Sequence, residues 1–180
     1  MVEQKIIVPI ESSAASTVVP AGETVFYSAT VLLRNMKMQI AAAVVGGIAG
    51  AAMRGATTYK THMLLTEQNV IWDTKKSGPI IVPWSDVDMF MKFSMQIRPP
   101  NMARLTLVYD KKNSSEDKKS YKARCKTFMY DMMPLVISSL KSLIENAASS
   151  GLDEKDIKKR QKKLEWFEKL YAKLEKKMKK

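Results

Sequence analysis

The spacing of apolar residues divides the chain into two regimes. Between residues 20 and 126, apolar residues form short runs of β-branched and aromatic side chains, separated by turns such as TEQN, KKSGP and RPPN. Runs of this length and composition predict strands. We expect about seven of them, at 24–33, 59–65, 70–74, 80–84, 87–97, 103–110 and 120–126.

After residue 126 the apolar spacing changes to intervals of three and four residues, which predicts a helix. Thr127 or Asp131 is the expected N-cap, Pro134 falls in the expected first turn, and the sequence around Gly151 ends the helix. Because one face is apolar throughout, we expect this face to close the open end of the sheet. The face consists of Met133, Val136, Ile137, Leu140, Leu143, Ile144 and Ala147.

A second helix is predicted for residues 152–180, where apolar residues recur in a heptad pattern broken only by Arg160. Trp166 and Leu170 widen its apolar face. Two arrangements stay open: docking on the chain's own domain, or pairing with a second copy as a coiled coil. The residues expected to carry either contact are Ile157, Leu164, Phe167, Tyr171 and Leu174.

These elements predict an α+β fold, a partly open β-barrel of about seven antiparallel strands capped by an amphipathic helix and followed by an extra basic helix. We expect an N-terminal lead-in at 1–19, one domain at 20–148 and the basic helix at 152–180. An Ala/Gly-rich apolar insertion at 35–57 interrupts the domain between its first two strands.

Three motifs of this outline resemble the pleckstrin-homology-like (PH-like) superfamily, in particular GRAM and bacterial PH-like domains. HMLLTEQNVIW at 62–72 resembles their hairpin, IIVPWSDVDMF at 80–90 the strand and turn that follow, and AGETVFY, with Glu23, the start of the first strand. The resemblance implies binding of phosphoinositides, other acidic lipids or protein partners, often through the connection of the first two strands. The insertion at 35–57 and the tail lie outside the family pattern.

The net charge of the chain favours anionic partners. Thirty Lys and Arg against 18 Asp and Glu give +12, and the isoelectric point is near 9.7. Residues 153–180 alone carry 12 basic and 6 acidic side chains, so 12 − 6 = +6 of this charge lies in the tail. A field of this sign attracts anionic lipid, an acidic protein face or nucleic acid.

The insertion between the first two strands is the strongest candidate for membrane contact. Residues 38–53 carry no charge, and as a helix they would span roughly 24 Å, which is less than a bilayer core. We expect shallow insertion by Ile40, Val44, Val45 and Ile48, with Arg34, Lys37, Arg54 and Lys60 contacting lipid head groups. The alternative is a helix that packs on the barrel or on a second copy through the ridge of Gly46 and Gly50.

Other basic residues are weaker candidates for head-group contact, namely Lys75, Lys76, Arg104, Lys122 and Arg124. The stretch YKARCK at 121–126 and the lysines of the tail could hold phosphates of nucleic acid without sequence preference. The body of the chain lacks the interleaved aromatic and basic residues of RNA-recognition surfaces, so nucleic acid ranks below lipid and protein as a partner.

Enzyme signatures are missing from the sequence. His62, the only histidine, has no Cys or Asp cluster at metal-ligand spacing, and GGIAG is not followed by the Lys of a phosphate loop. Cys125, the only cysteine, is expected to be a buried, inert thiol on a strand. We therefore expect no catalysis, no cofactor and no metal.

The resulting expectation is a cytoplasmic adaptor, peripheral at the inner face of a membrane, that binds acidic lipids. No signal peptide is apparent in the first ten residues. The alternatives are a protein-interaction or self-assembly module that uses the heptad tail, with a homodimer through that helix, and non-specific nucleic-acid binding.

Overall fold

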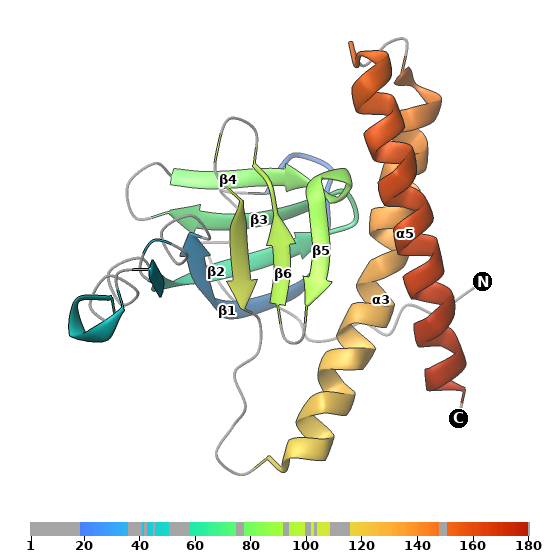
Figure 1. The fold of residues 1–180 in the computed structure, drawn as a ribbon. Coiled ribbons are helices and arrows are strands. Elements are labelled where there is room, and N and C mark those ends of the chain that lie inside the picture. The colour runs from blue at the N-terminus through green and yellow to red at the C-terminus, as the bar shows by residue number, and fades with distance from the viewer. Residues whose placement is uncertain are drawn as a thin grey trace.

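The computed structural model describes residues 19–35, 41, 43–44, 46–50, 58–74, 78–91, 94–99, 102, 104–108, 116–147 and 151–179. Within this part of the chain, seven antiparallel strands form one sheet that curls into a half-barrel, and two long helices follow (Figure 1). This confirms the predicted fold class, and the architecture is compatible with a PH-like fold. The strands are β1 (Val25–Asn35), β2 (Thr58–Thr66), β3 (Asn69–Thr74), β4 (Gly78–Pro83), β5 (Val87–Met91), β6 (Ser94–Ile97) and β7 (Leu105–Val108).

The strand order explains why the sheet is curled. It runs β4-β3-β2-β1-β7-β6-β5, so β4 and β5 are the two edges. Yet only the short 3-10 helix η2 (Trp84–Asp86) connects these edges. Three residues span at most about 14 Å between the flanking strands, so the sheet must bend round until its edges are neighbours. The long strand β1 pairs with β2 over most of its length and with β7 through Leu32 to Asn35.

The core lies inside the barrel and follows the two-residue period of the strands. Met63 and Leu65 point inward from β2, and Val70 and Trp72 meet them from β3. The helix α3 (Lys118–Glu145) closes the barrel with Met133, Val136 and Leu140. The face predicted to plug the sheet is therefore confirmed at its centre.

Two strand predictions are wrong, and their errors cancel in the count. Residues 87–97, expected as one strand, form the separate strands β5 and β6. Residues 120–126, expected as the last strand, are helical, because α3 begins at Lys118. The Asp117 side chain accepts hydrogen bonds from the backbone N–H groups of Lys119 and Ser120 at 2.7 and 3.0 Å, and the Lys, Ala and Arg residues that follow are good helix formers.

The early start of α3 corrects several details. Thr127 and Asp131 lie inside the helix and do not cap it, and Pro134 is exposed within the helix and not in its first turn. Cys125 is buried as expected, but on a helix face. Tyr121 and Cys125 are four residues apart, so the alternation that suggested a strand also fits one side of a helix.

The tail forms helix α5 (Glu154–Met178), capped at its N-terminus by Asp153. It returns along α3, and both helices lie on one side of the barrel (Figure 1). Tyr171 of α5 stacks on Tyr130 of α3, with ring centroids 5.1 Å apart. Phe167 reaches the barrel, where its ring meets the Phe90 ring edge-on at 6.2 Å. The tail thus docks on its own domain.

Candidate binding surface

Between β1 and β2 the described residues are 41, 43–44 and 46–50, and they lie on the side of the barrel away from α3 and α5 (Figure 1). Within this segment, residues 47–50 form a helical turn, and the Gly50 N–H donates to the Gly46 carbonyl oxygen at 2.8 Å. Gly46 and Gly47 have φ values of +64° and +54°, a backbone conformation that favours glycine. Two such residues in succession interrupt a right-handed helix at Gly46, so residues 41–50 are not one continuous right-handed helix.

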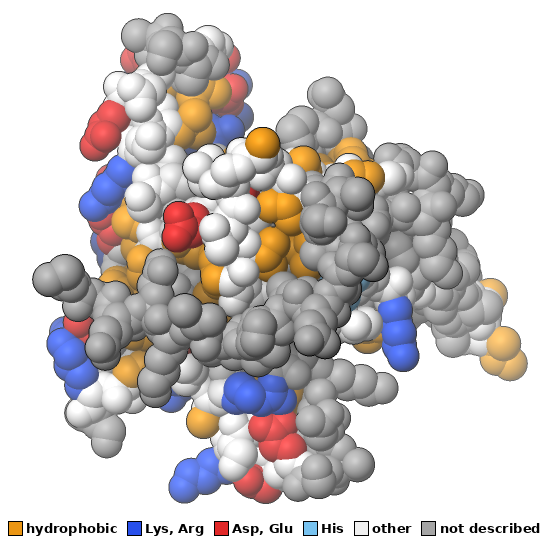
Figure 2. Space-filling model, turned by 180° about the vertical axis from the view of Figure 1, so that it is seen from behind, with side chains coloured by type: hydrophobic (Ala, Val, Ile, Leu, Met, Phe, Trp, Pro, Cys, Tyr) orange, Lys and Arg blue, Asp and Glu red, His pale blue; other side chains and the backbone are white. Residues whose placement is uncertain are grey.

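Apolar side chains on this segment are exposed to solvent. Val44 is 83% exposed and Ile48 is 92% exposed. Viewed from behind, hydrophobic side chains lie at the right-hand edge of the molecule, at the end away from the long helices (Figure 2). Of the remaining predicted membrane contacts, Ile40 and Val45 lie outside the described residues, as do the cations Lys37 and Arg54.

The two described cations of the predicted site lie at the base of this segment. Lys60 pairs with Leu32 in the sheet and is exposed. Arg34 pairs with Thr58 and is half-buried, and its Nε atom is buried with no hydrogen-bond partner among the described residues. The structure therefore brings Arg34 and Lys60 to the point where the segment joins the sheet.

The weaker basic candidates have different surroundings. Arg104 Nε lies 2.8 Å from a carboxylate oxygen of Asp88, and Arg124 forms a 2.7 Å ion pair with Glu116. Lys122 is exposed on α3, and Lys75 and Lys76 lie outside the described residues. Arg104 and Arg124 are therefore already paired with carboxylates of this chain.

Most of the residues expected to form an interaction helix pack against the core of their own chain. Phe167 and Leu174 belong to the buried core, and Leu164 and Tyr171 pack against it. Ile157 is partly buried near the start of α5. Since the heptad stripe is covered by α3 and the barrel, a homodimer through this stripe would require α5 to undock. Such a dimer stays a prediction.

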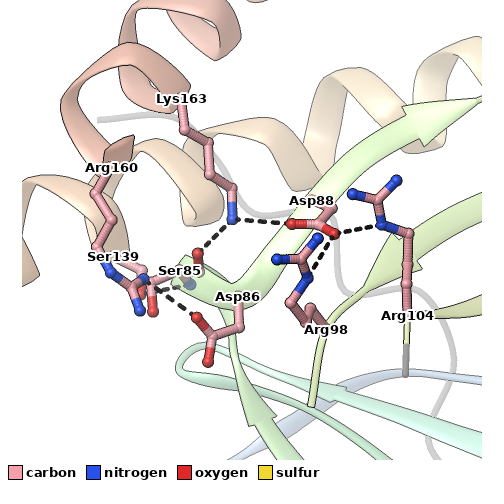
Figure 3. A network of polar contacts seen from close by, with 8 residues as sticks. All are labelled: Ser85, Asp86, Asp88, Arg98, Arg104, Ser139, Arg160 and Lys163. Atoms are coloured by element: carbon pink, nitrogen blue, oxygen red, sulfur yellow. Dashed lines mark hydrogen bonds and ion pairs between the residues drawn. The ribbon is translucent and has the colours of Figure 1, made fainter. Parts of the chain in front are cut away.

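A polar network holds α5 on the barrel, and sequence reasoning did not identify it (Figure 3). Arg160 donates to Asp86 at 3.1 Å, and the Lys163 ammonium donates to the Ser85 carbonyl oxygen at 2.7 Å. The Asp88 carboxylate forms ion pairs with three cations. Its oxygens lie 2.8 Å from Arg104 Nε, 3.6 Å from Arg98 Nε and 3.9 Å from Lys163 Nζ. The partners of Asp86 and Asp88 in α5, Arg160 and Lys163, are 74 and 75 positions away along the chain, so no local pattern indicates them.

Burial lowers the pKa of Lys163 to about 8, and the nearby carboxylates of Asp88 and Asp86 only partly offset this effect. An ammonium at this position is thus destabilised by lost hydration and held by one carbonyl oxygen and two acids. Each of the four cations contacts Asp86, Asp88 or the Ser85 carbonyl oxygen, and through Arg160 and Lys163 the network fastens α5 to the barrel.

The stability of this network should depend on pH. Between the folded-state pKa of about 8 and the unfolded-state value of roughly 10.4, the unfolded chain binds more protons at Lys163 than the folded chain does. The free energy of unfolding should therefore rise with pH in this window, and below it the full cost of burying the charge is present. Urea unfolding of wild type and Lys163→Met from about pH 7.5 to 10 measures the difference.

We expect wild type to gain about 2 kcal/mol relative to Lys163→Met over this range. The comparison stops near pH 10 because the pKa values of Tyr27 and Tyr171 are raised, the first by burial and the second mainly by its hydrogen bond to Tyr130. Above that pH the two tyrosines act in the opposite direction. A difference that stays flat from pH 7.5 to 10 would contradict the buried position of the ammonium.

The three motifs that resemble PH-like domains meet at the β2–β3 turn. Thr66 donates to Glu23 through its hydroxyl, and the Asn69 side chain donates to the same carboxylate at 2.7 Å. The Trp84 indole N–H donates to the Thr66 carbonyl oxygen at 2.9 Å. These residues therefore stabilise the fold, and the resemblance rests on positions with a structural role.

Metal sites and membrane-spanning helices are absent from the part of the chain that the structure describes. No group of three or more His, Cys, Asp or Glu side chains is placed to hold a metal ion. No helix in the described ranges is both long enough and apolar enough to cross a membrane. Burial raises the pKa of the Cys125 thiol, which disfavours its reactive thiolate form.

Comparisons with known proteins assign no family. No family model matches the sequence, and no curated protein matches it. Among solved structures, the chain is similar to the crystal structure of the C-terminal domain of an unknown protein from Leishmania infantum. The TM-score is 0.33 and the identity 11%, over 61% of this chain and 87% of that one. A similarity of this size carries no argument for function.

Proposed function

We propose that the chain is a non-enzymatic adaptor of the GRAM or bacterial PH-like kind that binds a membrane surface rich in acidic lipids. The observation that supports this is the exposure of Val44 and Ile48, at 83% and 92%, on a segment that projects from the barrel. Aliphatic side chains held this far from the core gain free energy when they enter the boundary between head groups and acyl chains.

Cations at the base of the projecting segment add electrostatic attraction. Lys60 is exposed there and Arg34 is half-buried, and the sequence places Lys37 and Arg54 on either side of the apolar stretch. Each basic residue near an anionic leaflet contributes about 1 kcal/mol, so the contact is reversible. The proposal places the protein in the cytoplasm, peripheral at the inner membrane face.

The lipid proposal is preferred over self-assembly because α5 already uses its apolar stripe within the chain. Phe167 is fully buried between α3 and the barrel, so a coiled coil through it would first have to break that contact. The projecting segment needs no such rearrangement. Its exposed side chains are available as they stand.

Replacing both exposed side chains, as Val44→Ser with Ile48→Ser, should weaken binding to vesicles that contain acidic lipid. We expect a loss of about tenfold in affinity, because two partly inserted aliphatic groups are removed. Co-pelleting with vesicles of neutral and acidic phosphatidyl lipids measures this, and binding by wild type should rise with acidic lipid and fall with salt.

The matched control removes two exposed apolar side chains elsewhere. Ile81 on β4 and Met102 before β7 are 41% and 46% exposed, and changing both to Ser should leave vesicle affinity within about twofold. Equal losses in the two double variants, or no vesicle binding by wild type, would remove the support for the projecting segment as a lipid contact.

A further inference from the structure

The outward side of α5 is lined by lysines. Lys155, Lys162, Lys169 and Lys176 are each seven residues apart, so they lie almost in one row along the helix. Lys173 and Lys177 lie beside this row, and all six are exposed. We call these six residues the lysine stripe. With α5 spanning 25 residues, the stripe follows a helix of about 37 Å.

Most acidic residues of α5 lie off the stripe. Glu154, Glu168 and Glu175 lie on the edge that turns toward α3, whereas Glu165, four residues before Lys169, borders the stripe. The contact between Glu168 and Lys141 of α3, at 2.9 Å, identifies this edge. The stripe itself makes no ion pair with any described residue, whereas the neighbouring Lys158 and Lys159 pair with Glu154 and Asp156.

The crowding of lysines on one side of α5 is informative because neighbouring like charges destabilise a helix. Glu and Lys four residues apart stabilise it a little, as Glu154 with Lys158 and Glu175 with Lys179 do elsewhere along α5. Here six lysines lie together on an arc of about 100°, where they repel one another. An anionic surface would remove this repulsion and release counter-ions.

The exposed aromatic residue of α5 lies among these lysines. Trp166 is 44% exposed, and helical spacing places it between Lys159 and Lys173, on the lysine side. Its ring meets Phe167 edge-on at 4.9 Å, so the buried neighbour supports it from below. A supported indole beside lysines fits the head-group layer, where Trp side chains are enriched.

We propose that the lysine stripe and Trp166 form a second contact with the anionic leaflet of a membrane. The docked α5 lies flat on the lipid head groups, with its apolar face still held by α3 and the barrel. This contact rests on the proposed function and extends it. Because the stripe lies on the far side of the molecule from the described residues between β1 and β2, the two contacts would not engage one flat stretch of leaflet together. Lipid is favoured over nucleic acid because one indole offers no row of aromatic rings for stacking on bases.

Charge reversal tests the stripe. Lys155, Lys162 and Lys169, changed together to Glu, should lower the affinity for vesicles of mixed neutral and acidic lipid by more than about tenfold. The control changes Lys118, Lys119 and Lys126 of α3 to Glu, which alters the net charge by the same amount. We expect that control to lose less than about threefold, and circular dichroism checks that both proteins are folded.

Fluorescence tests Trp166 directly. Trp72 and Trp84 are fully buried in the barrel, so a change in emission on adding acidic vesicles reports Trp166. We expect a shift to shorter wavelength in wild type, and none in Trp166→Phe. A shift produced by a DNA duplex and not by vesicles would assign the stripe to nucleic acid and overturn the lipid proposal.

The outcomes separate the two contacts. If charge reversal in the stripe leaves vesicle binding within about threefold while Val44→Ser with Ile48→Ser weakens it, the stripe is not a lipid site and the proposed function stands. If only the stripe variant weakens binding, the stripe is supported and the projecting segment is not. If the stripe variant and its α3 control lose the same vesicle affinity, net charge alone explains the binding, and the stripe is not a defined lipid contact.

Discussion

Phe167→Ala should destabilise the protein by about 3 to 5 kcal/mol, the usual cost of truncating a fully buried phenylalanine. Phe167 of α5 is fully buried and packs against the barrel. Its ring centroid lies 6.2 Å from that of Phe90. Its loss leaves a cavity between the barrel and both helices. Urea unfolding followed by circular dichroism measures the change.

The adjacent residue supplies the control for Phe167. Trp166→Ala removes a larger ring from the same helix turn, but this ring is 44% exposed, so we expect a loss of about 1 kcal/mol or less. Limited proteolysis adds a second readout, since undocking of α5 should expose the connection near Gly151 to cleavage in Phe167→Ala only. If both variants lose the same stability, Phe167 is not the residue that anchors α5.

Asp88→Asn should cost about 3 kcal/mol, although it changes a single atom of the side chain. Asp88 is mostly buried and lies within 4.0 Å of cationic groups on Arg98, Arg104 and Lys163. Removing one partner of a buried ion pair leaves uncompensated charge, which is far more costly than losing an exposed pair. The pKa of Lys163 should fall below its present value of about 8, because Asp88 is the carboxylate that raises it most.

Glu154→Gln is the matched control for the Asp88 variant. Glu154 also pairs with a lysine, Lys158 at 2.6 Å, but both side chains are largely exposed. Exposed pairs of this kind contribute about 0.3 to 0.5 kcal/mol. Thermal unfolding of the two variants at low and high salt compares them. A loss in Asp88→Asn below about 1 kcal/mol would mean that the network does not fasten α5.

The candidate contacts differ in how visible they are in the sequence. Val44 and Ile48 stand in an uncharged stretch between two strands, and the absence of charge indicated either membrane insertion or packing against protein. The lysine stripe could also be found by counting in sevens along 155–176. The side of α5 that faces outward could not be found in the sequence, because it depends on where Phe167 and Lys163 contact the barrel.

The wrong prediction of a strand at 120–126 shows that a short apolar pattern cannot distinguish a strand from a helix. Alternating Tyr121, Ala123 and Cys125 satisfy a strand, while Tyr121 and Cys125 alone satisfy a helix. The choice is made by the Asp117 cap and by packing against the barrel, where Tyr27 meets the Phe128 ring at 5.0 Å. Seven residues are too few for periodicity to separate the two structures.

The sequence by itself determined the classes of element and the order in which they occur: short strands, a plugging helix and a basic heptad helix. Period and turn chemistry act between near neighbours, so they can be read locally. Only the tertiary structure decided that β4 and β5 meet around Trp84 to Asp86, and that Asp86 and Asp88 fasten α5. The contacts of Asp86 and Asp88 with α5 join positions 74 and 75 residues apart, and their free energy exists only after the sheet has curled and the helices have docked.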